Sequence, residues 1–273
     1  MQMIKKGLKI YIETDLEGAS GLVSGRGGGQ IGTEDTPSYQ QYRHFLTGDV
    51  NAAIEGAIEG GAEEIIVNDS HGTKEHNIFI SELNPKARLL RSATGNWLPG
   101  LDKSVDAVFF IGAHAMAGTK NGFLDHTQSS LTIHDWYLNG IKVGEIGQLA
   151  AIAGHYDVPV VFVTGDLAAT IEAKKLLGNN VETVAVKKGI TRNYADGLNP
   201  STAQLLIREH AKLSLSKINK VKPFKLRKPI EMKIVFNRTD YAEEFAASRK
   251  SMKPKMPDAR TVIVKLRNIL EMF

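Results

Sequence analysis

Short apolar runs alternate with longer amphipathic stretches along the chain as far as about residue 218. The apolar runs are rich in β-branched and aromatic residues, which is typical of buried strands. They cover residues 8–14, 64–68, 107–112, 158–165 and 182–186. The amphipathic stretches repeat their apolar residues at helical spacing and cover residues 39–60, 146–155, 167–177 and 201–218. This alternation predicts an α/β fold, a largely parallel sheet flanked by helices.

One segment inside this alternation has a different pattern. Residues 130–143 resemble two short strands joined at Asn139-Gly140. Asn-Gly is a favoured dipeptide in two-residue hairpin turns, because both positions need a positive φ angle. The segment therefore predicts a β-hairpin.

The pattern changes again near Asn219. Residues 221–229 are basic and contain two prolines, which is typical of a junction. A strand, a helix and a strand are predicted after it, over residues 230–236, 240–248 and 261–265. We therefore expect a larger α/β domain over residues 1–218 and a smaller C-terminal α/β subdomain over residues 219–273.

The composition limits the classes of function. Hydrophobic residues make up 42% and charged residues 23%, which is enough for a substantial core in an ordinary globular protein. The net charge is +4, and the one basic cluster, residues 212–233, contains a single aromatic residue, Phe224. A nucleic-acid surface usually combines a basic stripe with stacking aromatics, so we expect no nucleic-acid partner. The chain has no cysteine, which excludes disulfides and thiolate sites.

No apolar run approaches the roughly 18 residues that a membrane helix needs, so no membrane association is expected. Residues 1–9 lack the continuous apolar segment of a secretory signal. The expected location is therefore the cytoplasm.

Polar side chains follow three of the predicted strands at the point where each strand ends. Asp15 and Glu17 follow the first strand, His71 follows the second, and His114 follows the run at residues 107–112. Ligands of open α/β sheets bind beyond the carboxyl ends of the strands. The sequence therefore predicts that these four side chains meet at one edge of the sheet.

The carboxylates in this set need a counter-charge. Asp15 and Glu17 are two residues apart and point the same way in an extended chain, so both stay ionised only beside a cation. The alternative is a pair of solvated loop acids. Glu145 begins a predicted helix, where an acid can also simply complement the helix dipole.

Charge arithmetic favours two metal ions. Asp15, Glu17 and Glu145 carry −3, and two divalent ions with one hydroxide balance that charge. If Asp15 bridges, these carboxylates together with His71 and His114 supply three contacts to each ion. Three protein ligands with an open water position are usual at catalytic zinc sites, and histidine favours zinc over magnesium. A metal pair of this kind polarises a carbonyl and activates water.

His126 lies in a predicted loop near the same edge. It could steady a tetrahedral intermediate or transfer a proton, and the alternative is a solvated loop histidine. The other histidines lack strand-end positions, and we interpret them as surface or packing residues: His44, His76, His134, His155 and His210.

Two competing motifs carry little weight. Residues 27–32 match G-x-G-x-x-G, but about a dozen residues separate them from the preceding strand, whereas a dinucleotide fingerprint follows its strand directly. The G-x-S-x-G nucleophile elbow of serine hydrolases is absent.

The order and local sequence of these segments resemble one known family. The matching motifs are Asp15-Leu16-Glu17-Gly18, Asn68-Asp69-Ser70-His71, Gly112-Ala113-His114, His126, Val143-Gly144-Glu145-Ile146-Gly147, and residues 155–160 and 164–166. Together they resemble the D-aminopeptidase (DppA-type) family of zinc peptidases. The likeness runs from about residue 9 to residue 200, and the C-terminal quarter resembles the family only loosely. The glycine-rich loop Gly25–Gly32 differs from the family pattern, and the interval between His126 and Glu145 is about one residue longer.

The resemblance implies a binuclear zinc site held by Asp15, Glu17, His71, His114 and Glu145, with Asp15 bridging. It implies that His126 acts in catalysis without being a principal metal ligand. It also implies a ring-like homo-oligomer such as a decamer, and a preference for short peptides or amides with a D-amino acid at the amino end.

We therefore expect a zinc-dependent aminopeptidase with two zinc ions per chain, acting on short peptides. One alternative keeps the two metals but changes the substrate, giving an amidase or an L-specific peptidase. Another is a non-catalytic, metal-dependent peptide-binding protein.

Overall fold

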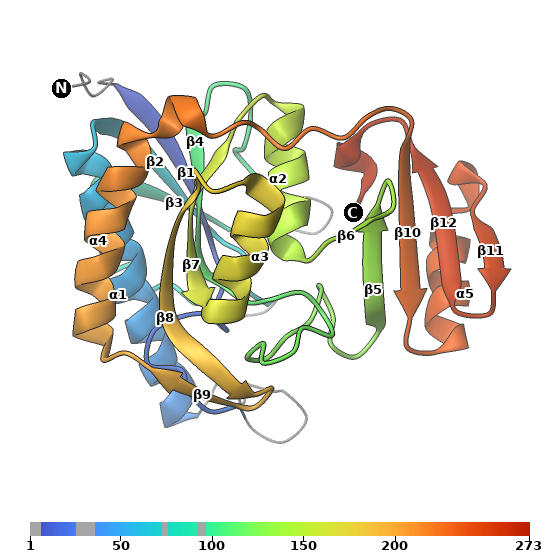
Figure 1. Ribbon diagram of the computed structural model, residues 1–273, viewed down its shortest axis with the longest axis horizontal. Coiled ribbons are helices and arrows are strands. Elements are labelled where there is room, and N and C mark those ends of the chain that lie inside the picture. Colours follow the sequence, from blue (N-terminus) through green and yellow to red (C-terminus); the bar gives the residue numbers. More distant parts are fainter. Residues whose placement is uncertain (1–6, 26–35, 73–75, 92–96) are drawn as a thin grey trace.

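The computed structural model describes residues 7–25, 36–72, 76–91 and 97–273. The G-x-G-x-x-G match at residues 27–32 and most of the glycine-rich loop lie outside these ranges. Figure 1 shows two layered units side by side, a larger one built on a long twisted sheet and a smaller one that contains the C-terminus.

The larger unit contains a seven-stranded sheet in the order β3-β2-β1-β4-β7-β8-β9. Its strands are β1 (Leu8–Thr14), β2 (Ala62–Asp69), β3 (Ala87–Arg91), β4 (Ala107–Ala113), β7 (Val160–Asp166), β8 (Glu182–Thr191) and β9 (Tyr194–Gly197). All neighbouring strands are parallel except the β8–β9 pair at one edge, which is antiparallel. This confirms the predicted α/β class, and the central strands β1, β4 and β7 are mostly apolar and almost entirely buried because both faces are covered.

Helices cover both faces of this sheet (Figure 1). Helices α1 (Pro37–Glu59) and α4 (Pro200–Ser216) pack together on one face, and α2 (Glu145–His155) and α3 (Leu167–Leu177) lie on the other. The alternation within β1 shows why two cores form. Ile10 and Ile12 pack into the core under α1 and α4, whereas Tyr11 points into the core on the opposite face.

Local sequence signals fix the ends of these helices. Thr36 caps α1 by accepting a hydrogen bond from the Tyr39 amide, and Pro37 occupies the first helical turn. Asp166 caps α3 in the same way through the Ala169 amide. Asp166 therefore ends strand β7 and also begins the helix that follows it.

The smaller unit is a five-stranded sheet in the order β11-β12-β10-β5-β6. Its strands are β5 (Ile133–Leu138), β6 (Ile141–Lys142), β10 (Ile230–Phe236), β11 (Lys255–Asp258) and β12 (Thr261–Leu266), and α5 (Thr239–Ser248) packs on β10 and β12. Short 3₁₀ turns lie at Ile218–Lys220, Lys250–Met252 and Ile269–Glu271. Among the described residues, no helix is both long and apolar enough to cross a membrane.

The predicted hairpin at residues 130–143 is present as β5 and β6, and it belongs to the smaller sheet. Strand β5 lies antiparallel to β10, with Trp136 opposite Ile234. One continuous apolar core contains Trp136, Ile234 and Leu149 of α2, so the two units share buried residues. The smaller sheet thus draws on residues 133–142 as well as on the last quarter of the chain. The division of the chain near residue 219 stays a prediction.

Candidate metal centre

The carboxyl ends of β2, β1 and β4 meet at one edge of the large sheet, because these strands are neighbours in that order. Asp15 directly follows β1, His114 directly follows β4, and His71 lies two residues beyond β2. The loop after β1 folds tightly against the end of β4 through Gly18, whose amide donates to the Gly112 carbonyl at 2.7 Å. A Cβ atom on Gly18 would lie 2.1 Å from the Ala113 carbonyl oxygen, so only glycine allows this approach.

The structure brings all six predicted side chains together in two adjoining groups. The ligand atoms of Asp15, Glu17 and His71 lie within 4.8 Å of one another, and so do those of His114, His126 and Glu145. His114 links the groups, since its Nε2 atom is 3.3 Å from Asp15 Oδ2 and 3.3 Å from Glu145 Oε1. His71 Nε2 is 3.2 Å from Glu17 Oε1.

Each of the three imidazole rings has an oxygen atom within hydrogen-bond distance of its Nδ1 atom. The Nδ1 atom of His71 is 3.2 Å from Asn77 Oδ1, that of His114 is 3.0 Å from the Ala115 carbonyl, and that of His126 is 2.7 Å from the Leu124 carbonyl. Because each acceptor is an oxygen, each Nδ1 carries the proton, and each Nε2 faces the carboxylates. An oxygen acceptor behind a histidine that presents its other nitrogen is the usual second layer of a metal site.

Several polar atoms of the centre are buried with no hydrogen-bond partner in the part of the chain that the structure describes. They are Asp15 Oδ2, Glu17 Oε2 and His114 Nε2. A buried polar atom without a partner costs free energy, roughly 1–3 kcal/mol for each group. Divalent cations among these atoms would provide the missing partners, so the donor set fits a metal centre of oxygen and imidazole ligands.

The charges of the centre shift its pKa values strongly in the absence of metal. Burial and the neighbouring Glu17 raise the pKa of Asp15 well above its usual range. Burial would also raise the pKa of Glu17, but His71 outweighs burial and holds that pKa well below normal. Burial lowers the pKa of His71, yet Glu17 overcomes it and raises the pKa to about 10. Opposed shifts of this size are typical of functional sites, where like charges are held together.

His126 differs from the other two histidines. Its ring is stacked on that of His114, with centroids 3.9 Å apart and planes 9° apart, and its Nε2 is 3.9 Å from Glu145 Oε1. Burial lowers the pKa of His126, and the neighbouring His114 lowers it further. Burial also lowers the pKa of His114, but Glu145 overrides burial and raises that pKa well above normal. His126 is therefore the histidine of the centre that stays neutral most readily.

Three supporting residues were not predicted from the sequence. Asn77 orients His71 and accepts a 2.8 Å hydrogen bond from the Tyr39 hydroxyl. The Gln128 amide donates to Glu145 Oε1 at 2.7 Å from a backbone with φ of 62°. Lys187 lies buried under the loop that carries Glu17. For Lys187, a charged residue directly after the apolar end of the strand predicted at residues 182–186 was the one signal available, and the other two had none.

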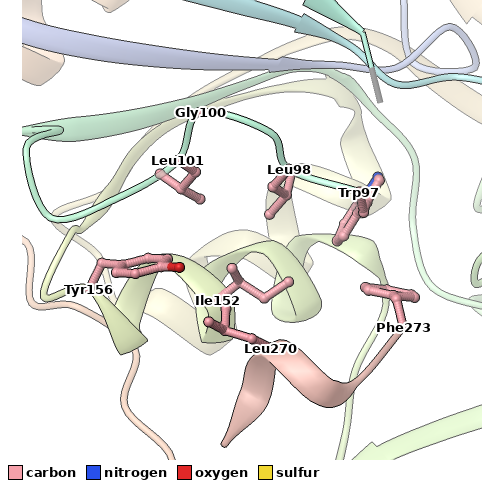
Figure 2. A pocket seen from close by; sticks show the side chains of 8 residues that line it. All are labelled: Trp97, Leu98, Gly100, Leu101, Ile152, Tyr156, Leu270 and Phe273. Atoms are coloured by element: carbon pink, nitrogen blue, oxygen red, sulfur yellow. The ribbon is translucent and has the colours of Figure 1, made fainter. Parts of the chain in front are cut away.

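A separate pocket of about 300 Å³ lies beside α2 (Figure 2). Trp97, Leu98 and Leu101 line one wall, Ile152 of α2 and Tyr156 just after it face them, and Leu270 and Phe273 close the remaining side. No charged side chain lines this pocket among the described residues, and it includes none of the six residues of the metal centre. The pocket therefore lacks the groups that hydrolysis requires.

Comparison with known proteins gives consistent matches. A family profile described as D-aminopeptidase matches residues 8–273. The chain is similar to the D-aminopeptidase of Bacillus subtilis (strain 168), with 35% identity over 224 residues, which cover 79% of this chain and 77% of that protein. The fold is similar to a solved structure titled "Zn-dependent D-aminopeptidase DppA from Bacillus subtilis, a self-compartmentalizing protease", with a TM-score of 0.88, 31% identity, and coverage of 97% of this chain and 93% of that one.

Proposed function

The chain belongs to the D-aminopeptidase family, and from that membership we propose that it is a zinc-dependent aminopeptidase that removes D-amino acids from the amino end of short peptides. One observation of its own residues carries the proposal. Three imidazoles from separate segments turn their Nε2 atoms toward three carboxylates, of which Asp15 and Glu17 are buried, and several buried atoms between them lack hydrogen-bond partners among the described residues. A set of this kind is costly without cations and well suited to them.

We propose that two zinc ions are held by Asp15, Glu17, His71, His114 and Glu145, with Asp15 bridging. The close approach of His114 to both Asp15 and Glu145 supports a shared site rather than two separate ones. When bound, the zinc ions would polarise the scissile carbonyl and lower the pKa of water.

His126 is proposed as the group that moves protons. Its Nδ1–H is held by the Leu124 carbonyl, so the Nε2 lone pair faces the centre. A neutral imidazole with this tautomer can take a proton from the attacking water and return it to the leaving amine. The lowered pKa of His126 keeps the ring in this form near neutral pH.

Burial and hydrogen bonds from backbone amides hold the three carboxylates in place. Asp15 and Glu17 are largely buried, and Asp15 Oδ1 accepts a 2.9 Å hydrogen bond from the Leu16 amide. Glu145 is fixed by the Gln128 amide. These contacts set the carboxylate positions before substrate arrives, which lowers the cost of reorganisation during reaction.

Elemental analysis and kinetics together test the proposal. The purified protein should contain two zinc ions per chain, lose activity when a chelator removes them, and regain activity when zinc is restored. A protein that hydrolyses peptides at its original rate after verified complete metal removal would contradict the metal mechanism.

A matched panel of D- and L-aminoacyl amides and short peptides tests the substrate class. We expect faster hydrolysis of the D-series with a free amino group. Preference for the L-series would instead identify an L-specific peptidase, and turnover of amides without peptides would identify an amidase. Tight peptide binding without turnover at saturating zinc would identify a binding protein.

We also propose a ring-like homo-oligomer, such as a decamer, because the similar solved structure is titled self-compartmentalizing. Light scattering in solution tests it, and a monomer at working concentration would contradict it. The cytoplasmic location stays a prediction that cell fractionation can test.

A further inference from the structure

A lysine ammonium group is buried directly under the loop that carries Asp15 and Glu17. Lys187 is 4% exposed, and its Nζ donates to the carbonyl of Glu17 at 2.7 Å and to the carbonyl of Leu22 at 2.6 Å. The same Nζ atom also lies over the ring of Phe123, 4.7 Å from the ring centroid. Lysine is rarely this buried unless it is paired, so its place requires an explanation.

A β-bulge in β8 turns this side chain inward. Along β7 and β8, Gly165 pairs with Ala185 and Asp166 pairs with Lys187, so one extra residue is inserted in β8. Val186 and Lys187 are consequently both buried, whereas Lys188 is exposed. Bulges commonly re-aim a side chain beside an active site.

The charges that surround Lys187 come from several elements. Asp166 at the end of β7 and Asp49 of α1 face it, together with Glu17 and Asp15. The Asp49 carboxylate accepts hydrogen bonds from the amide and the hydroxyl of Ser20, which lies in the loop after β1, each at 2.7 Å. Asp166 accepts from the amides of Phe123 and Ala169. The acids nearest to Lys187 therefore have other structural partners.

The loop after β1 is held by its amides at other points. The Asp15 amide donates to the Ile111 carbonyl at 2.9 Å, and the Gly18 amide donates to the Gly112 carbonyl. Among the residues that the structure describes, Lys187 is the group that donates to the Glu17 carbonyl. Fixing this carbonyl fixes the peptide plane that follows Glu17, and so the direction in which its carboxylate leaves the backbone.

We propose that Lys187 is a positioning residue of the metal centre, which holds Glu17 and the loop to Leu22 in the conformation that binds metal. The proposal rests on the function proposed above, because it assigns Glu17 as a metal ligand. It adds a residue in β8 that lies outside the proposed ligand set and binds the backbone of the loop that carries Glu17.

An electrostatic role and a positioning role for Lys187 predict opposite changes in metal affinity when the lysine is removed, which makes the proposal testable. If Lys187 acted only through its positive charge, its removal would make the centre more negative and tighten metal binding. If it positions Glu17, its removal should weaken metal binding. Loss of a supporting group behind a ligand typically weakens metal affinity about 10–100-fold.

The experiment titrates metal-free protein with Co²⁺ and follows the visible absorption of the bound ion, which reports ligand geometry. Wild type, Lys187→Met and the matched control Lys188→Met are compared. We expect two binding steps in wild type and in Lys188→Met, and in Lys187→Met one step weakened about 10–100-fold with a changed spectrum. Equal or tighter binding by folded Lys187→Met would overturn the proposal.

Rescue separates positioning from a general loss of structure. The chain has no cysteine, so Lys187→Cys can be alkylated with 2-bromoethylamine in denaturant and refolded, which restores an ammonium of nearly the same length. We expect the aminoethylated protein to regain both binding steps, while unmodified Lys187→Cys refolded in parallel does not. Circular dichroism and elution volume confirm folding, and Lys187→Gln replaces Lys187→Met in the titration if Lys187→Met fails to fold. Recovery without aminoethylation would also overturn the proposal.

Failure of this inference can be distinguished from failure of the proposed function. Wild-type protein that binds fewer than two ions would refute the binuclear site itself. Wild type with two ions and Lys187→Met with the same affinities would refute only the role of Lys187.

Discussion

Each histidine of the metal centre is oriented by an oxygen acceptor that depends differently on the sequence. The acceptors for His114 and His126 are backbone carbonyls, which any residue at positions 115 and 124 would supply. The acceptor for His71 is the side chain of Asn77, which also donates to Asp69 Oδ1 and to the His71 carbonyl. The orientation of His71 therefore depends on side-chain chemistry, while that of the other two depends on the path of the backbone.

Replacing His126 by alanine should separate catalysis from metal binding. We expect His126→Ala to keep its zinc and to lose about 10²–10⁴-fold in rate, the usual contribution of a positioned acid or base. Elemental analysis and steady-state kinetics check both parts. His134→Ala on the exposed side of β5 is the matched control and should behave as wild type. A zinc-free His126→Ala protein would instead make His126 a metal ligand.

Glu172 makes stability depend on pH. It accepts a 2.8 Å hydrogen bond from the Met116 amide, and burial raises its pKa from 4.5 to about 7 although that bond opposes the shift. Because the folded pKa is above the unfolded one, its contribution to stability is complete below about pH 4.5 and is lost as pH rises through about 7. At about 1.4 kcal/mol per pKa unit, the loss is roughly 3 kcal/mol.

Glu172→Gln should remove this dependence. We expect the variant to be more stable than wild type by roughly 3 kcal/mol at pH 8 and nearly equal near pH 4.5, as measured by urea unfolding with a chelator present. Glu209→Gln on the exposed side of α4 is the control. Parallel stability curves for wild type and Glu172→Gln across this range would show that Glu172 ionises freely in the fold.

Four of the six central side chains could be predicted directly from strand ends, whereas Glu145 rested on charge arithmetic and His126 on a loop near the same edge. Their supporting residues could not be predicted. Asn77 lies six residues beyond His71 in an irregular segment, and the Gln128 amide reaches Glu145 through a left-handed backbone that non-glycine residues seldom adopt. The inward turn of Lys187 needs a bulge whose position depends on pairing with β7.

At the scale of elements, the strongly apolar strands and amphipathic helices were predicted closely. Helix α3 and strand β10 begin and end at the predicted residues. Strands β3, β9 and β11 were not predicted, because each lies at a sheet edge and has few buried residues. Edge strands carry charged and polar side chains that hide the alternating pattern.

The turn of the β5–β6 hairpin gives a test at this scale. Asn139 and Gly140 have φ angles of 49° and 79°, the signs that the predicted two-residue turn requires. Gly140→Val should cost roughly 1–2 kcal/mol, because a β-branched residue is disfavoured at positive φ. Gly140→Asn should cost less, since asparagine tolerates this conformation. Urea unfolding of the two variants checks the order, and equal stabilities would argue against a strained turn.

At the scale of the whole molecule, metal binding and folding should be linked. The proposed ligands come from the ends of three strands and from the start of α2, so the unfolded chain has no assembled site. Zinc at about 100 times its dissociation constant should add about 2.7 kcal/mol for each ion. For a chain of this size, each kcal/mol raises the melting temperature by roughly 2–4 °C.

Thermal unfolding with added zinc and with a chelator checks this linkage. We expect the melting temperature to rise by about 10 °C or more between the two conditions, since two ions contribute. Binding should also release protons, because ligand imidazoles must be deprotonated, and calorimetry in two buffers of different ionisation enthalpy measures them. An unchanged melting temperature would show that zinc does not bind the folded chain preferentially.

The pairing of β5 with β10 has a consequence for the order of assembly during synthesis. The Asn139 side chain accepts from the Glu231 amide, a partner that follows it by 92 residues. During synthesis on a ribosome, β5 and β6 are made before β10. The edge of β5 that pairs with β10 therefore stays unpaired until β10 has been made. The smaller sheet, which leads through β6 to Glu145 at the start of α2, is therefore completed only when synthesis is nearly finished.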